Sequence, residues 1–271
     1  MNDDVVVSTA WVAERLGKAN VRIIDVPTAS GGYASGHLPG AVAIDWQREL
    51  IEREDESSGM VIDPHRFAGL ARKLGIRPDD SLVFYGDGGG RHAARAHWTF
   101  EYYRHPGALH WMDGGRERWR AEGRPISDEA PEVEPSAYPM PSARQPELRI
   151  AAADIRSRIG QPDFVVLDVR TAEEYAGTDV RAARGGHIPG ATHVFWEDAL
   201  APDKSLLPRE ELAALYASIP RDAEVAVHCQ LGVRAAHTWL VLRHVLGYQH
   251  ARNYDGSWQE WGNREDLPVE R

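Results

Sequence analysis

Cys229 is the only cysteine in the 271-residue chain, and its neighbours are arranged for chemistry. The apolar run at 224–228 has the pattern of a buried strand, and a helical pattern begins near Ala235. A tight turn from a strand into a helix directs successive backbone N–H groups toward one point, at the positive end of the helix dipole. Both effects favour a thiolate over a thiol, so the turn predicts a cysteine that carries negative charge.

The six residues CQLGVR, 229–234, form this turn. Gly232 can adopt backbone angles that are closed to other residues, and Arg234 places a permanent cation at the end of the loop. We therefore expect Cys229 to be a nucleophile. The alternative is a small buried apolar side chain, which is the usual role of a lone cysteine in a reducing compartment. The strand, the glycine and the arginine together favour the nucleophile.

The chain repeats itself. GHLPGAVAIDW at 36–46 matches GHIPGATHVFW at 186–196, and SLVFYGDGGG at 81–90 matches EVAVHCQLGV at 224–233. Asp113 and Asp255 differ by 142 positions, as do Trp119 and Trp261. We infer two homologous domains. An offset of 142 places Asp87 opposite Cys229, which predicts one active and one inactive copy.

Prolines mark the boundary between the copies. Six of the 17 prolines lie between 125 and 146, where they favour an extended, semi-rigid linker. The predicted domains are an N-terminal inactive domain at 1–124, a linker at 125–147 and a C-terminal catalytic domain at 148–271.

Short apolar runs alternate with amphipathic ones in each copy, which favours an α/β fold with a parallel sheet flanked by helices on both faces. In the first copy we expect helices at 8–17, 64–75, 95–105 and 116–123, and strands at 21–26, 82–86 and 109–115. Binding sites of such sheets lie at the carboxyl ends of strands, where Cys229 is placed.

Composition excludes several classes of function. The net charge of −10 argues against generic nucleic-acid binding, and no apolar run is long enough to span a membrane. One cysteine cannot form an internal disulfide, and the acidic N-terminus lacks a signal pattern. The expected compartment is the cytoplasm.

Four segments together resemble the tandem-domain rhodanese family of sulfurtransferases. They are YASGHLPGAVAI at 33–44, GHIPGA at 186–191, CQLGVR at 229–234 and ARNYDGSWQEW at 251–261. The resemblance covers nearly the whole chain. It implies two tandem rhodanese-like domains with the active site near their interface.

The resemblance also implies a chemistry, the ping-pong transfer of a sulfane sulfur. Cys229 would attack the outer sulfur of thiosulfate, release sulfite and pass its persulfide sulfur to cyanide or a thiol. The backbone N–H groups of Gln230, Leu231, Gly232, Val233 and Arg234 would stabilise the persulfide, and Arg234 would hold the donor's anionic group. No metal or organic cofactor is implied, because the persulfide is the carrier.

Three alternatives remain open. Phosphatases use a Cys-x5-Arg loop, whereas Arg234 here follows Cys229 in a shorter Cys-x4-Arg loop that suits a single sulfur better. Mercaptopyruvate sulfurtransferases resemble CGSGVT at the loop and place an arginine where this chain has Glu174. The loop looks closer to those of bacterial tandem rhodaneses to which thiosulfate is usually assigned. A non-enzymatic sulfur-carrier or regulatory module is the third alternative.

Further residues could support the loop. Asp168 and Arg170 follow a strand and could hydrogen-bond the loop, although an ordinary strand-end ion pair is the alternative. Arg181 and Arg184 could steer anions toward the cysteine loop. The alternative is that they belong to an ordinary solvated loop. Arg91 and His92 of the first domain could face the active site across the interface.

Overall fold

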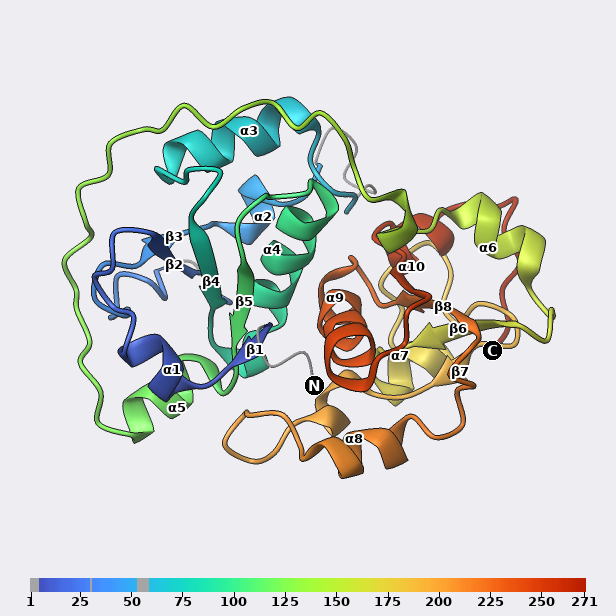
Figure 1. Cartoon of the computed structure of the whole chain (residues 1–271). Helices are drawn as coiled ribbons and strands as arrows, with labels where there is room; N and C mark the ends of the chain where they lie inside the picture. Colours follow the sequence, from blue (N-terminus) through green and yellow to red (C-terminus); the bar gives the residue numbers. More distant parts are fainter. Residues whose placement is uncertain (1–4, 30, 53–58) are drawn as a thin grey trace.

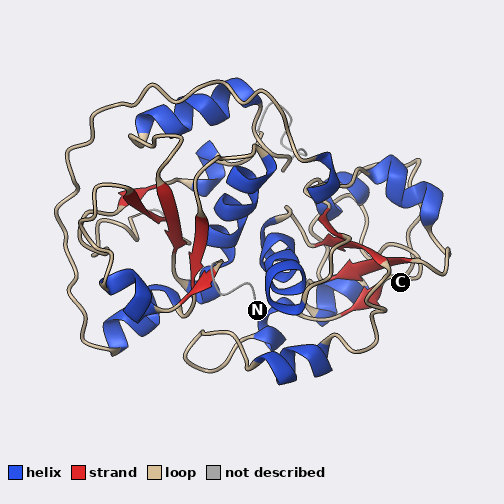
Figure 2. Ribbon diagram, viewed as in Figure 1, coloured by secondary structure: helices blue, strands red, loops and turns tan. Residues whose placement is uncertain are grey.

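A computed structural model describes residues 5–29, 31–52 and 59–271, which form two α/β domains that lie side by side (Figure 1). Figure 2 shows that the strands of each domain form their own central sheet with helices around it. The first sheet has the order β1-β5-β4-β2-β3, and the second has the order β7-β6-β8-β9. All paired strands run parallel, so the expected fold is confirmed.

The strands are short, as is usual where both faces of a parallel sheet are covered. Those of the first domain are β1 (Val6–Val7), β2 (Val21–Asp25), β3 (Val42–Ala43), β4 (Ser81–Tyr85) and β5 (Leu109–Met112). Those of the second domain are β6 (Phe164–Asp168), β7 (Thr192–His193), β8 (Glu224–His228) and β9 (Ala251–Asn253).

The helices of the first domain are α1 (Thr9–Ala13), α2 (Trp46–Glu49), α3 (Pro64–Lys73), η1 (Gly88–Gly90), α4 (Arg91–Tyr102) and α5 (Gly115–Ala121). Those that follow are η2 (Pro146–Leu148), α6 (Ala152–Arg158), α7 (Ala172–Ala176), η3 (Trp196–Ala199), α8 (Arg209–Leu215), α9 (Val233–Leu240), η4 (Val241–Leu246) and α10 (Ser257–Trp261). η4 is a π-helical continuation of α9.

Sequence signals explain where several helices begin and end. Asp63 caps α3 by accepting hydrogen bonds from the backbone N–H groups of His65 and Arg66, and Pro64 is its first residue, as expected. Ser8 caps α1 by accepting a hydrogen bond from the backbone N–H of Trp11. However, α1 ends at Ala13 instead of Gly17, because residues 14–17 continue as turns. The expected helix at 95–105 in fact begins at Arg91.

One continuous cluster of buried apolar side chains joins the two domains. It includes Phe84 and Trp98 of the first domain together with Trp196 and Trp239 of the second. Helix α4 packs directly against α9 between the two sheets (Figure 1). Smaller clusters lie under α1 and α5 on the outer face of the first sheet, and under α6 and α10 on the outer face of the second. The two domains therefore share one core, and α4 of the first domain lies against α9 of the second.

The segment after α5 runs extended around the first domain before it enters the second (Figure 1). Ser127 pairs with His37 in a single antiparallel bridge. Further along, the backbone of Ser136 donates to Arg72 and that of Gln145 donates to Tyr102. These bonds fasten the Pro-rich linker to the first domain, and proline limits its freedom elsewhere.

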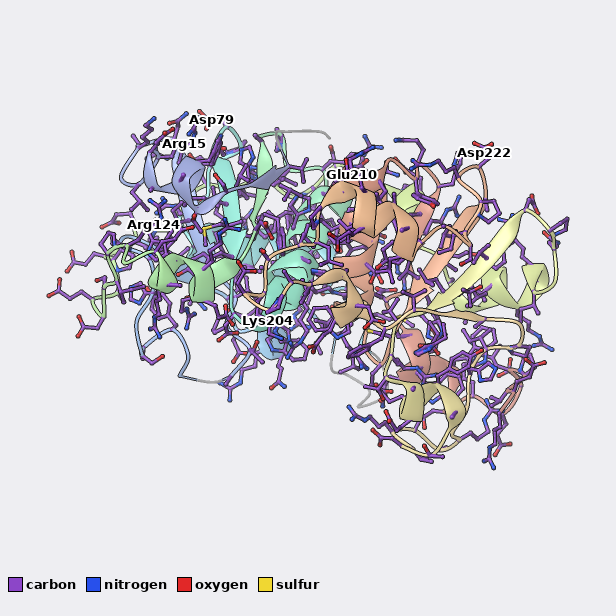
Figure 3. All side chains as sticks on the ribbon, turned by 90° about the horizontal axis from the view of Figure 1, so that it is seen from below. Arg15, Asp79, Arg124, Lys204, Glu210 and Asp222 are labelled. Carbon is purple, nitrogen blue, oxygen red and sulfur yellow. The ribbon has the colours of Figure 1, made fainter. Side chains whose placement is uncertain are left out.

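Charged side chains stand on the outside of both domains (Figure 3). The labelled examples are Arg15, Asp79 and Arg124 in the first domain and Lys204, Glu210 and Asp222 in the second. Within the described residues, no helix combines the length and the apolar character that crossing a membrane requires.

Candidate active site

Cys229 follows the last residue of β8 and is 1% exposed. Helix α9 begins only four residues later, at Val233, with Gly232 as its N-cap. The carbonyl of Cys229 accepts a hydrogen bond from the N–H of Trp258, and that of Gln230 accepts one from the N–H of Gln259. The loop is thus fastened to the start of α10, and it leads directly into the N-terminus of α9.

Ser257 clamps both ends of the loop, and the sequence analysis missed it. Its Oγ accepts hydrogen bonds from the N–H groups of Cys229, at 3.1 Å, and Gly232, at 3.0 Å, and donates to the carbonyl of Tyr254 at 2.7 Å. Ser257 has a φ of 52°, an uncommon value for a residue with a side chain. The motif at 251–261 contains this serine directly after Gly256, so the signal was present in the sequence.

The clamp changes one expectation about the loop. The N–H of Gly232 was expected to point at the sulfur, but it already donates to Ser257. Among the described residues, the N–H groups of Gln230 and Leu231 form no hydrogen bond. Those two groups and the first N–H groups of α9 are therefore the donors left for an anion.

Gly232 is a position that only glycine can fill. Its φ is 68°, and a Cβ there would lie 2.6 Å from the Cα of Asp255 and 2.8 Å from Nη1 of Arg95. The carbonyl of Gly232 accepts hydrogen bonds from Asn253 Nδ2, at 3.1 Å, and Arg95 Nη1, at 3.3 Å. Arg95 is fully buried in α4, so the first domain directly supports the cysteine loop of the second.

Arg234 lies against Glu174 in a bidentate ion pair. The two nitrogen–oxygen distances are 2.6 and 2.8 Å, and Glu174 is fully buried at the capping box of α7. Burial opposes ionisation of Glu174, but its bonds to Arg234 outweigh burial and lower its pKa. Burial likewise disfavours the charged form of Arg234, yet Glu174 and Cys229 raise the pKa of the guanidinium. Arg234 is therefore a fixed cation beside the cysteine.

Asp168 and Arg170 support the site indirectly. They form a buried bidentate pair, with Arg170 Nη2 2.6 Å from Asp168 Oδ2, and Arg170 also donates to the carbonyl of Gly186. The guanidinium lies 4.4 Å from the ring centroid of Trp258, next to Ser257. Neither side chain forms a hydrogen bond to the loop in the described structure. The expected direct contact is wrong, and the pair instead shapes the packing behind α10.

Arg184 does not have the role that we expected. Its guanidinium donates to backbone carbonyls at the end of α10 and beyond, those of Trp261, Gly262, Arg264 and Leu267. It is therefore a structural residue and does not line the pocket at Cys229. Arg181 does line that pocket, and its Nε lies 3.7 Å from Glu174 Oε1. The two arginines of this loop thus have different functions, which their spacing alone did not reveal.

A pocket of about 340 Å³ opens at Cys229 between the domains. It is lined by residues of both domains: Trp46, Arg91, His92, Thr171, Arg181, Phe195, Trp196, Glu197, Cys229, Gln230, Leu231, Val233 and Arg234. Arg91 and His92 of the first domain line this pocket together with Cys229. Of the supporting residues named from the sequence, Asp168, Arg170 and Arg184 lie outside it.

Arg91 brings a second cation to the cysteine. Its guanidinium lies 5.4 Å from the ring centroid of Trp196. Burial lowers its pKa, and the charges of Glu197 and Cys229 act in the opposite direction. His92 is neutral, since burial and the charge of Arg91 lower its pKa to about 3. The pocket therefore combines fixed positive charge with a thiol, which suits a small anion.

The corresponding loop of the first domain corrects one prediction. Asp25 pairs with Tyr85 in the register between β2 and β4, as Asp168 pairs with His228 between β6 and β8. Gly86 therefore occupies the place of Cys229, and Asp87 does not. Both loops end at a left-handed glycine cap, Gly90 and Gly232, so the loop of the first domain is one residue longer.

The loop of the first domain also differs from the cysteine loop in its side-chain contacts. Asp87 accepts a hydrogen bond from the N–H of Thr28 at 2.8 Å, and Arg116 of α5 pairs with Asp25 at 2.5 Å. Arg116 thus replaces the cation that Arg170 supplies in the second domain. Burial raises the pKa of Asp25 to about 6 despite Arg116. This loop presents no nucleophile at the end of its strand.

Known proteins resemble this chain along almost its whole length. A family model described as a rhodanese-like domain matches residues 8–122 and again 151–264. A thiosulfate sulfurtransferase of Corynebacterium glutamicum is 39% identical over 98% of this chain and 90% of its own length. A sulfur carrier protein, TtuD, of Thermus thermophilus is 38% identical over 98% of this chain and 96% of its own length.

Solved structures share the fold. An anaerobic ergothioneine biosynthesis enzyme of Chlorobium limicola, in complex with trimethyl histidine, superimposes with a TM-score of 0.87 at 22% identity. An EanB variant in complex with ergothioneine gives the same TM-score at 21% identity. Each comparison covers 98% of this chain and 70% of the other. At this identity, the likeness shows the two-domain architecture and nothing about the substrate.

Proposed function

This chain belongs to the rhodanese family, and we propose that it moves a sulfane sulfur from thiosulfate to a thiophilic acceptor through a persulfide on Cys229. The observation that carries the proposal is the position of Cys229 in a pocket with Arg91 and Arg234, one cation from each domain. A thiolate and a small dianion repel each other. Two fixed cations beside the thiolate offset this repulsion, so the dianion can approach the sulfur.

In the first half-reaction, the thiolate of Cys229 attacks the outer sulfur of thiosulfate. A new sulfur–sulfur bond forms to Sγ, while the bond between the two sulfurs of the donor breaks and its electron pair leaves with sulfite. The product is a persulfide anion on Cys229. The N–H groups of Gln230 and Leu231, which form no hydrogen bond to the described residues, and those at the start of α9 are donors for this charge.

In the second half-reaction, the acceptor attacks the terminal sulfur of the persulfide. With cyanide, a carbon–sulfur bond forms, the persulfide bond breaks, and its electron pair returns to Cys229 as thiolate. Thiocyanate is released, and no net oxidant or reductant is consumed. The second step restores the charge that the loop held at the start, so one preorganised loop serves both half-reactions.

The side chains that distinguish the loop support thiosulfate as the donor. Gln230 Nε2 donates to the carbonyl of Arg181, at 3.0 Å, and to Gln259 Oε1, at 2.9 Å, so it holds neighbouring segments. Leu231 packs against Gly59, where a Cβ would lie 2.9 Å from Leu231 Cδ2. Glu174 stands where mercaptopyruvate sulfurtransferases have an arginine, and it pairs with Arg234, so this position offers no cation to the carboxylate of mercaptopyruvate. The cations remain as the recognition elements, and they suit a sulfonate-like group.

The proposal is tested by a single-turnover experiment on the intact chain. Incubation with thiosulfate should add about 32 Da to the peptide that contains Cys229, the mass of one sulfur atom. Addition of cyanide should remove that mass and release one thiocyanate per chain. A parallel reaction with 3-mercaptopyruvate should proceed more slowly. A protein that gains sulfur only from mercaptopyruvate would contradict the choice of donor.

A sulfur-carrier function is a second candidate, since a relative of almost the same length is named a sulfur carrier. Cys229 is 1% exposed, so an acceptor must reach the persulfide through the pocket between the domains. A carrier would gain the sulfur from thiosulfate and retain it in the presence of cyanide. The same experiment therefore separates the two functions, because an enzyme discharges to the small acceptor.

A further inference from the structure

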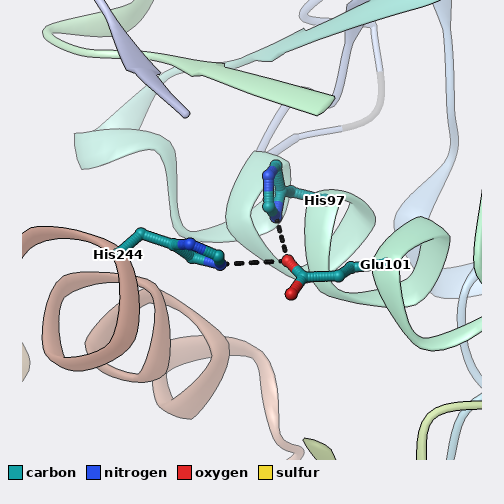
Figure 4. A group of neighbouring side chains, drawn as sticks. All are labelled: His97, Glu101 and His244. Atoms are coloured by element: carbon teal, nitrogen blue, oxygen red, sulfur yellow. Dashed lines mark hydrogen bonds and ion pairs between the residues drawn. The ribbon is translucent and has the colours of Figure 1, made fainter. Parts of the chain in front are cut away.

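His97, Glu101 and His244 form a cluster at the interface of the two domains, outside the pocket of Cys229. His97 and Glu101 lie one turn apart on α4, and His244 belongs to η4 of the second domain. Figure 4 shows both imidazoles directed at the carboxylate between them. One ligand atom from each residue lies within 4.8 Å of the other two.

The distances are close to those of a first coordination shell. His244 Nε2 lies 3.0 Å from Glu101 Oε2, and His97 Nδ1 lies 3.7 Å from the same oxygen. Metal–ligand bonds of about 2.0–2.2 Å in a tetrahedral site place ligand atoms roughly 3.3 Å apart. Shifts of an ångström or so, within the reach of side-chain rotation, would bring the three ligand atoms around one ion.

His97 is a buried polar side chain whose nitrogens the fold leaves unused. Neither ring nitrogen has a hydrogen-bond partner of ordinary geometry among the described residues, and the side chain is 1% exposed. Its ring nitrogens are thus available as ligand atoms, and imidazole nitrogen is the commonest protein ligand of transition metals. An unsatisfied buried imidazole costs stability unless something binds it.

Neighbouring groups complete the arrangement. Arg243 Nε lies 3.9 Å from Oε1 of Glu101. The two histidines contact the other oxygen, Oε2, which is therefore the one left to bind an ion. Outer partners such as Arg243 orient metal ligands in known sites. A pocket of about 450 Å³, lined by Glu101, Arg243 and His244 among others, gives access from solvent and room for a water ligand.

We propose that His97, Glu101 and His244 bind one divalent transition-metal ion, Zn²⁺ foremost, as a bridge between the two domains. Two imidazoles and one carboxylate suit Zn²⁺ and related metals, whereas a single carboxylate beside Arg243 is too little for Ca²⁺ or Mg²⁺. The resemblance to rhodaneses implies no metal for catalysis, and this site lies apart from the sulfur chemistry. The ion ties α4 to η4 and so stabilises the packing that places Arg91 and Arg95 at the cysteine loop.

The test measures Zn²⁺ binding by the full-length chain in competition with a colorimetric chelator. The wild type should bind about one Zn²⁺ per chain. His244→Gln and Glu101→Gln should each lower the affinity by more than about 100-fold, beyond the effect expected of a residue that only orients a ligand. Loading with Co²⁺ should give the intense visible bands of a four-coordinate site in the wild type and not in His244→Gln.

Two controls separate this site from other metal-binding groups. His65→Gln, at an exposed histidine of the first domain, should bind Zn²⁺ like the wild type. Cys229→Ala should also bind it, which excludes the thiol and makes the result independent of the proposed sulfur transfer. Circular dichroism confirms that each variant is folded. A wild type that binds no Zn²⁺, or equal affinity in the wild type and a folded His244→Gln, would overturn the proposal.

Discussion

Arg95 of the first domain donates a hydrogen bond to the carbonyl of Gly232 in the cysteine loop of the second, over 3.3 Å. Arg95 also donates to the carbonyl of Gly59, and its guanidinium lies 4.7 Å from the ring centroid of Trp98. The side chain is fully buried, and burial lowers its pKa to about 10, so it remains charged at neutral pH. The first domain thus helps to hold the cysteine loop of the second.

Replacement of Arg95 by methionine should therefore reduce catalysis. Arg95→Met roughly keeps the length of the side chain but removes its hydrogen bonds, so the carbonyl of Gly232 keeps only the bond from Asn253. We expect kcat/KM for thiosulfate to fall by up to about 100-fold, the size of effect that a misplacement of about 1 Å produces. Arg156→Met, at an exposed ion pair with Asp266, is the matched control. A folded Arg95→Met variant with wild-type kinetics would show that the contact is irrelevant to the loop.

Ser257→Ala should affect both stability and activity. The change leaves the buried N–H groups of Cys229 and Gly232 without their shared acceptor, which should cost about 2–4 kcal/mol in the free energy of unfolding. Because the same bonds shape the loop, kcat/KM should fall as well. Urea denaturation and steady-state kinetics check both effects. Ser157→Ala removes an exposed hydroxyl and serves as the control; equal stability of the two variants would refute the clamp.

Arg91→Met tests whether the first domain contributes to binding of the donor. Loss of this cation should raise KM for thiosulfate by about 10-fold or more, since a hydrogen bond to a charged group contributes about 1.5–3 kcal/mol. It should also weaken the dependence of kcat/KM on ionic strength. Arg48→Met, at an exposed arginine of the same domain, is the control. An unchanged KM in Arg91→Met would remove Arg91 from the recognition of the donor.

We expect the buried His237 to lower the free energy of unfolding of the protein in mild acid. It is fully buried beside Trp111 and Trp196, has no hydrogen-bond partner among the described residues, and burial lowers its pKa to about 3. A histidine whose folded pKa lies below its unfolded value of about 6.5 stabilises the fold above pH 6.5. That contribution is lost as the pH falls toward 3. At pH 5 the loss from this group is about 2 kcal/mol.

His237→Leu should remove this part of the pH dependence. The free energy of unfolding of the variant should fall less than that of the wild type between pH 7 and pH 5, as measured by urea denaturation at each pH. His250→Gln controls for the loss of a surface histidine. Parallel pH profiles for His237→Leu and the wild type would show that His237 is not a buried neutral group.

The sequence predicted the elements that local patterns encode. An apolar run, a glycine and an arginine around Cys229 were enough to predict the strand, the turn and the helix, because strand burial and helix starts have local signals. The internal repeat predicted two domains. The offset of 142, counted from Asp113 and Asp255 and from Trp119 and Trp261, misplaced Asp87, because the extra residue in the first loop changes the offset between strand and helix. The sequence held the signal, because the matched segments 81–90 and 224–233 are 143 positions apart and so place Gly86 opposite Cys229.

Contacts between distant segments could not be predicted. Arg95 reaches Gly232 only because α4 packs on α9, and that packing depends on the shared core of both domains. The difference between Arg181 and Arg184 is similar, since both belong to one loop and only its folded path decides which faces the pocket. The sequence singled out Glu174 because mercaptopyruvate sulfurtransferases have an arginine at that position. Its partner in the structure is Arg234, sixty positions further along the chain.

Formation of thiocyanate from thiosulfate and cyanide by the wild type and by Cys229→Ala is the most direct test of the account. The wild type should turn over repeatedly, and Cys229→Ala, with an unchanged circular dichroism spectrum, should show no turnover above the uncatalysed reaction. That result would mean that every sulfur atom passes through this one thiol. Turnover by a folded Cys229→Ala variant at a rate near that of the wild type would contradict the persulfide mechanism.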